Sequence, residues 1–258
     1  MTISFRAPPV NEVVIGKAFE PHQALLIPHY GLYWQLIQEQ FPTTQHAAPI
    51  VERGESIGAD SEVGVPLPRV WFVSEDKTRL LQLQNGRLYY NWRQTDLSEP
   101  YERFDSVYQP FLNYLNLFQS FFASQFASSP VWRRCDLTYV NVFRRGEGWE
   151  DFSDVSGLFS NLLVPRDLRL CKLVSAALRI EYELHEAPGR LVVSINPAKN
   201  AKTNEPALRV ELAASSTSAP TNADDERHWF DVAHRAIVQS FCDITSPDMQ
   251  EKYWRRIS

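Results

Sequence analysis

The residues of this 258-residue chain that could do chemistry do not assemble into a known catalytic signature. Neither G-x-G-x-x-G nor G-x-x-x-x-G-K-[ST] occurs, which argues against dinucleotide and P-loop chemistry. His185 precedes Glu186 but lacks the second histidine of an H-E-x-x-H metal motif. On a helix, His228, Asp231 and His234 would spread over about 120° of the surface, which suits a single metal ion poorly. We therefore expect no catalytic set, no metal site and no cofactor.

The first candidate for a binding surface is one face of a predicted β-hairpin. Asn85 and Gly86 form the typical two-residue hairpin turn, because both turn positions need a positive φ. Alternation along the two strands places leucine and tyrosine side chains on one face and polar or cationic ones on the other. The candidate binding residues on this second face are Arg87, Tyr89, Asn91 and Arg93. The alternative is the ordinary solvated face of an antiparallel sheet.

Nucleic-acid binding by this hairpin is a further alternative, since Tyr89, Trp92 and Arg93 could stack on bases. The formal net charge of −5 argues against it, because no positive field would attract a polyanion. The partner that the sequence favours is a protein or a small ligand.

A second candidate site is a cleft between two halves of the chain. Such clefts often hold pockets, and Tyr139, Asn141, His185 and Arg93 could converge there. If they do, the chain is an enzyme without a recognised signature. Glu12 has a separate role in our interpretation, because it lies at the entry to an otherwise apolar strand. An unpaired buried carboxylate costs several kcal/mol, so we expect Glu12 to be a structural anchor paired with an arginine.

Composition places the chain among folded proteins with a large core. Hydrophobic residues make up 44% and charged residues 22%, which argues against disorder and against a coiled coil. No apolar run approaches the ~18 residues of a membrane span, and the N-terminus does not resemble a signal peptide. The three cysteines, Cys135, Cys171 and Cys242, are widely spaced and are expected to be buried thiols. A cytoplasmic protein follows from these features, and its oligomeric state stays open.

The order of the predicted elements repeats once. Strands are expected over 10–19, 70–73, 78–84 and 87–93, with helices over 29–41 and 110–126. In the second half, strands are expected over 134–143, 172–186, 190–196 and 207–213, with helices over 152–163 and 226–241. Residues 43–68 are expected to form a long irregular loop and 214–225 a polar loop. We predict an α+β fold over residues 1–258, built of two β-α-β-β-(β)-α halves (1–128 and 129–258), with long helices on one face of an antiparallel sheet.

Several segments resemble one sporadically distributed bacterial family of about 250 residues. They are APPVNEVVIGKAFEP, RVWFVSEDKTRLLQLQNGRLYYNWR, CDLTYVN and SFCDITSPDMQEKYW, in this order. The resemblance lies in a P-P-[VI]-x-E opening strand, a W-F-[IV]-S-E-D meander that ends in N-W-R, and a D-[LI]-T-[TS] tail. The family has no assigned activity, so the resemblance supplies no catalytic residue. It implies a bacterial origin and an association with accessory genes, such as defence or toxin-linked cassettes.

The function that the sequence favours is a non-catalytic binding or interaction protein. An enzyme with a cleft between the two halves is the alternative. A pocket lined by titratable groups in contact with one another would favour the alternative.

Overall fold

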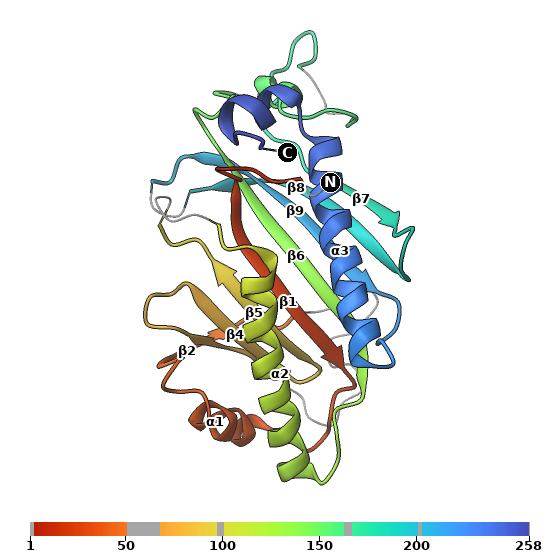
Figure 1. Ribbon diagram of the computed structural model, residues 1–258. Helices are drawn as coiled ribbons and strands as arrows, with labels where there is room; N and C mark the ends of the chain where they lie inside the picture. The colour runs from red at the N-terminus through yellow and green to blue at the C-terminus, as the bar shows by residue number, and fades with distance from the viewer. Residues whose placement is uncertain (1–2, 51–67, 97–100, 163–166, 201–202, 258) are drawn as a thin grey trace. The chain divides into compact units, whose positions relative to one another are not determined.

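The computed structural model describes residues 3–50, 68–96, 101–162, 167–200 and 203–257. Nine strands are hydrogen-bonded in the order β2-β3-β4-β5-β1-β6-β9-β8-β7 (Figure 1). The α+β class with an antiparallel sheet is therefore confirmed. The chain divides into two compact units, which are described separately below as the α2 unit and the α3 unit.

The α2 unit comprises Val14–Thr95 and Arg103–Cys135. Its elements are most of β1 (Val10–Phe19), α1 (Ile27–Gln35), β2 (Thr43–Ala47), β3 (Arg69–Val73), β4 (Arg79–Gln84), β5 (Arg87–Arg93), α2 (Phe104–Phe126) and the start of β6 (Trp132–Arg144). The register of β4 and β5 pairs Leu83 with Leu88 and Leu81 with Tyr90, as the alternation predicts. A turn at Asn85-Gly86 is also confirmed, but only Gly86 has a positive φ, of 98°, so the expectation of a positive φ at both turn positions is wrong for Asn85.

Aromatic side chains form the core of the α2 unit. The ring centroid of Phe118 on α2 lies 5.5 Å from Phe19 on β1 and 5.4 Å from Tyr33 on α1. Strand β1 approaches β5 so closely that a Cβ atom on Gly16 would collide with the backbone of Leu88. Glycine at this position thus allows the two strands to pair.

The first helix differs from its prediction. It begins at Ile27 and ends at Gln35 instead of running over 29–41, and Leu32 and Leu36 are exposed. Tyr30 and Tyr33 are buried in their place. The spacing of Leu32, Leu36 and Ile37 predicts that these side chains are buried, but only Ile37 is, because the larger tyrosine rings bury more apolar surface and orient the helix.

Two further boundaries in the α2 unit differ. Helix α2 begins at Phe104, six residues before the expected start at Pro110, because Val107 and Tyr108 also turn inward and extend the buried face. The segment 43–68, expected to be an irregular loop, begins with strand β2, which pairs with β3. Residues 51–67 of that segment lie outside the described residues.

The α3 unit comprises Met1–Val13, Asp96–Glu102 and Asp136–Ser258. It holds most of β6, the 3₁₀ segment Phe152–Gly157, β7 (Leu178–Glu183), β8 (Gly189–Lys199), β9 (Pro206–Ser216), α3 (Ala223–Ile244) and a π-helical turn over Met249–Tyr253. Helix α3 begins at the Asn222 cap, whose side chain accepts a hydrogen bond from the backbone N–H of Asp225. Acidic residues fill its first turn, where the helix dipole favours them.

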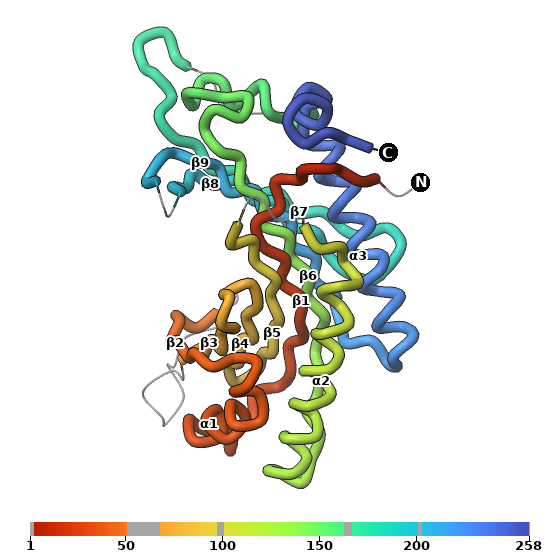
Figure 2. The backbone as a smooth tube through the Cα atoms, turned by 60° about the vertical axis from the view of Figure 1, so that its left-hand side comes forward, coloured from red at the N-terminus to blue at the C-terminus, as the bar shows by residue number. Residues whose placement is uncertain are grey.

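The two ends of the chain meet within the α3 unit (Figure 2). Phe5 forms a β-bridge with Arg256, and the backbone N–H of Ala7 donates to the carbonyl of Trp254. The Trp254 ring packs 5.0 Å from Phe143 on β6 and 5.0 Å from Phe241 on α3. This aromatic cluster and the backbone contacts beside it hold the two ends of the chain next to one end of α3.

Several elements of the α3 unit are shorter or longer than expected. The helix expected over 152–163 is a single 3₁₀ segment, and the strand expected over 172–186 is limited to β7. The polar loop expected over 214–225 is shortened from both sides, because β9 continues to Ser216 and α3 begins at Ala223. In each unit the first strand lies next to the last strand of the following meander. The internal duplication itself stays a prediction.

Candidate functional site

The polar face of the β4–β5 hairpin is buried, contrary to the expectation of a solvated or ligand-binding surface. Arg87, Tyr89 and Asn91 are each less than one-tenth exposed, and Arg93 is half-buried. The expected accessibility of the first three residues is therefore wrong. Another segment of the chain covers part of this face, because the backbone N–H of Ile50 donates a hydrogen bond of 2.8 Å to Oε1 of Gln84.

Gln82 is the centre of the hydrogen bonds on this face. Its amide nitrogen donates to Asn91 Oδ1 at 2.7 Å, and its Oε1 accepts from Arg69 and from the Trp71 indole. Sequence alternation assigned these side chains to the correct face. It could not show that other parts of the chain cover that face.

Tyr139 and Asn141 are also buried, in the α3 unit. The hydroxyl oxygens of Tyr139 and Tyr101 lie 2.9 Å apart, and the Tyr139 ring stacks on His234. Burial raises the pKa of Tyr101, so its hydroxyl stays protonated. Asn141 donates to the carbonyl of Val210. Tyr139 and Asn141, both predicted as site residues, thus form these hydrogen bonds within the core.

Arg93 belongs to the α2 unit, whereas Tyr139, Asn141 and His185 belong to the α3 unit. Their predicted convergence therefore stays a prediction. Glu12 lies half-buried in β1, and its role as an anchor also stays a prediction.

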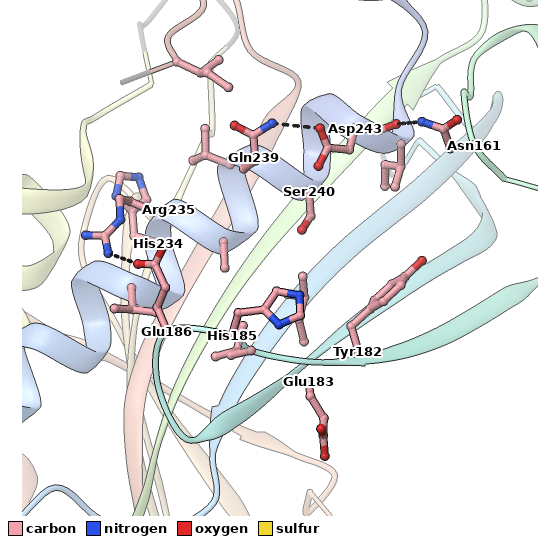
Figure 3. Close-up of a pocket in the computed structure, with 17 residues that line it drawn as sticks. Asn161, Tyr182, Glu183, His185, Glu186, His234, Arg235, Gln239, Ser240 and Asp243 are labelled. Carbon is pink, nitrogen blue, oxygen red and sulfur yellow. Dashed lines mark hydrogen bonds and ion pairs between the residues drawn. The ribbon is translucent and has the colours of Figure 1, made fainter. Parts of the chain in front are cut away.

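His185 is the predicted site residue that lines a pocket. The pocket has a volume of about 700 Å³ and lies between the end of β7 and helix α3, entirely within the α3 unit (Figure 3). We call it the β7–α3 groove, and its principal lining residues are Tyr182, Leu184, His185, Ala236, Ser240 and Asp243. The groove exists because β7 is the last strand in the hydrogen-bonding order, and α3 packs on β9 rather than on β7.

The groove combines an apolar lining with a few polar groups. Leu184 and Ala236 contribute apolar surface, and Tyr182 is 43% exposed. His185 and Ser240 face the groove from opposite sides (Figure 3), and their side chains form no hydrogen bond with the residues that the structure describes. These two side chains are thus available to a ligand.

The charged residues of the groove are partly paired. Arg235 donates to Glu186 at 2.6 Å, and Gln239 donates to Asp243 at 2.8 Å. Asn161 donates to the backbone carbonyl of Asp243. With Glu183, the lining carries three carboxylates and one arginine, so the groove favours neutral or cationic ligands over anions.

A second, smaller pocket of about 410 Å³ lies at the C-terminal end of α3. Gln250 lines this pocket, donates to the carbonyls of Cys242 and Thr245, and accepts from Arg256. Burial raises the pKa of the Cys242 thiol to about 11, which makes the thiol unreactive. Cys135 is buried as predicted, but the prediction for Cys171 is wrong, because it lies exposed on a loop.

A metal-binding cluster and a membrane-crossing helix are both absent from the described part of the chain. No three histidine, cysteine, aspartate or glutamate residues there lie together in a way that could hold a metal ion. Among these same residues, no helix is long and apolar enough to cross a membrane.

Sequence reasoning missed Ser240, which is half-buried, and Asp243, which is exposed; both lie on α3 and neither belongs to a motif. It also overlooked Gly54-Glu55-Ser56-Ile57-Gly58, which matches G-x-S-x-G, the nucleophile motif of hydrolases. This motif lies outside the described residues. Comparison of the chain with protein-family models, curated proteins and solved structures found no match.

Proposed function

We propose that this chain is a non-catalytic binding protein and that the β7–α3 groove is its ligand site. The observation that carries the proposal is a groove with an apolar lining, faced by the unengaged side chains of His185 and Ser240. Small-molecule sites commonly have volumes of about 300–1,000 Å³ and combine an apolar lining with few polar groups. The volume of the groove, about 700 Å³, falls in this range.

The chemistry of the groove favours an amphipathic ligand with an apolar body and a cationic group. The apolar body would contact Leu184 and Ala236, while a cation would lie near Asp243. His185 and Ser240 would supply hydrogen bonds that fix the ligand's orientation. An anionic ligand would be disfavoured, because the lining carries three carboxylates and one arginine.

Binding rather than catalysis is supported by how the titratable groups of the groove are used. Glu186 is engaged with Arg235 and Asp243 with Gln239, so these two carboxylates serve contacts between side chains. General base catalysis needs a base within about 3 Å of the group that it deprotonates. Within the described residues, His185 forms no such contact with Ser240.

A thermal-shift panel of small amphipathic amines and carboxylates tests the proposal. We expect amines to stabilise the protein and carboxylates of the same size to have no effect. Ala236→Trp should abolish the shift because it fills the groove, whereas His228→Trp adds the same side chain at an exposed site of α3 outside the groove. Equal shifts in both variants would contradict the proposed site, and chemical conversion of the bound amine would favour an enzyme.

A further inference from the structure

Strand β7 has a free edge in the described part of the sheet. It is the last strand in the hydrogen-bonding order, and Figure 1 shows no described strand beyond it. Such an edge presents unpaired backbone N–H and C=O groups that can pair with another strand. Four of its six residues, Arg179, Glu181, Tyr182 and Glu183, are exposed.

The backbone register shows which groups point outward. The N–H of Leu184 donates to the carbonyl of Gly189 on the β8 side. In an antiparallel pair, alternate residues bond to the partner strand, so the even-numbered residues of β7 bond to β8. The N–H and C=O groups of Arg179, Glu181 and Glu183 therefore point toward the free edge.

We propose that a second copy of this chain binds at this edge, with the two β7 strands antiparallel and centred on Ile180. This register places Arg179 opposite Glu181 of the second copy, and Glu181 opposite Arg179 of the second copy. Their outward N–H and C=O groups can then form four backbone hydrogen bonds. The same symmetric pairing brings two opposite-charge side-chain pairs together on one face.

The charge pattern selects this register over its neighbour. A shift of the centre to Glu181 would also place Arg179 opposite Glu183 of the second copy, but it would bring the two Glu181 carboxylates opposite each other, which destabilises a strand pair. Arg179 forms no ion pair with the described residues, whereas Glu181 is bonded to Arg190 at 2.8 Å. In the dimer, Glu181 would therefore lie between Arg190 of its own chain and Arg179 of the second.

Burial of apolar side chains on the helix-facing side of β7 also favours the register centred on Ile180. The register centred on Ile180 places Leu178 opposite Tyr182 of the second copy, on the same face as Ile180. Tyr182 is 43% exposed in the single chain, so the pairing would cover an apolar ring that is otherwise in water. The dimer would also add the second copy's Leu178 beside the β7–α3 groove.

Light scattering during gel filtration tests the dimer. We expect the wild-type chain to elute with twice the mass of one 29.7 kDa chain. Arg179→Glu and Glu181→Arg should each weaken association by about tenfold or more, because each places like charges opposite at two symmetric positions. Circular dichroism shows whether each variant is folded.

Mixing the two variants supplies the decisive result. Their heterodimer regains opposite charges at both positions, so the mixture should recover the dimer that neither variant forms alone. Glu183→Arg is the matched control, because residue 183 faces position 177 in the proposed register and should leave the dimer intact. A wild-type chain that is monomeric up to about 100 µM would overturn the proposal, as would a dimer that survives either reversal.

Discussion

The side-chain amide of Gln82 on β4 donates a hydrogen bond of 2.7 Å to Oδ1 of Asn91 on β5, and both side chains are less than 5% exposed. Buried polar groups need partners, because each unpaired one costs about 1–3 kcal/mol. The polar face of the hairpin therefore stabilises the α2 unit.

Gln82→Leu should lower the free energy of unfolding by about 1–3 kcal/mol, because Asn91, Arg69 and Trp71 would each lose a hydrogen-bond partner. Gln38→Leu makes the same change at an exposed residue and should have little effect. Urea denaturation measures both. Equal effects of the two substitutions would show that the buried hydrogen bonds contribute no stability.

Gly16→Ala should destabilise the α2 unit by more than about 1 kcal/mol, because the added methyl group would collide with the Leu88 backbone. Gly31→Ala is the matched control. Its Cβ atom would meet nothing within 4 Å, and it lies in α1, where alanine is favoured over glycine. Thermal denaturation should show opposite shifts in Tm for the two variants. A stabilising Gly16→Ala would mean that β1 and β5 pair less closely than described.

Thiol labelling should distinguish the three cysteines. Cys171 is exposed and should react rapidly with a disulfide reagent at pH 8. Cys135 and Cys242 should react only on unfolding, because both are buried and the pKa of Cys242 is raised to about 11. Cys171→Ser should remove the rapid phase. A rapid phase that persists in this variant would contradict the burial of the other two thiols.

The protein should lose stability at alkaline pH through its buried tyrosines. Burial raises the pKa of Tyr30 to about 12, so the folded state favours the protonated phenol. The associated stability is complete below pH about 10 and is lost as the pH rises toward 12, by at most about 2–3 kcal/mol. Tyr30→Phe should flatten this loss, whereas Tyr253→Phe, at an exposed site, should not. An identical pH profile for both variants would contradict the assignment to Tyr30.

Local sequence signals predicted some strands well, but β2 was missed and the strand expected over 172–186 is limited to β7. β1 and β5 have the expected bounds, because β-branched residues, the Pro21 that follows β1 and the Asn85-Gly86 turn act over short distances. The register of the hairpin followed from the same turn. Helix orientation was harder to predict, because Leu32 and Tyr33 are both apolar and only tertiary packing decides which is buried.

The candidate site could be predicted only in part. His185 was identified, but its groove depends on where α3 packs, and no local pattern specifies that β7 is left uncovered. The burial of Arg87 and Asn91 could not be predicted for the same reason. Alternation shows on which face of the sheet a residue lies, but not whether other segments of the chain bury that face. Contacts between segments distant in the sequence therefore decide which polar residues are accessible to a ligand.

The most direct test of the binding function is an NMR titration of the full chain with 2-phenylethylamine, which combines an apolar ring with a cation. We expect millimolar affinity, with amide shifts concentrated at residues 182–186 and 236–243, and loss of these shifts in Ala236→Trp. Shifts absent from these residues, or retained unchanged in Ala236→Trp, would contradict a ligand site in the β7–α3 groove.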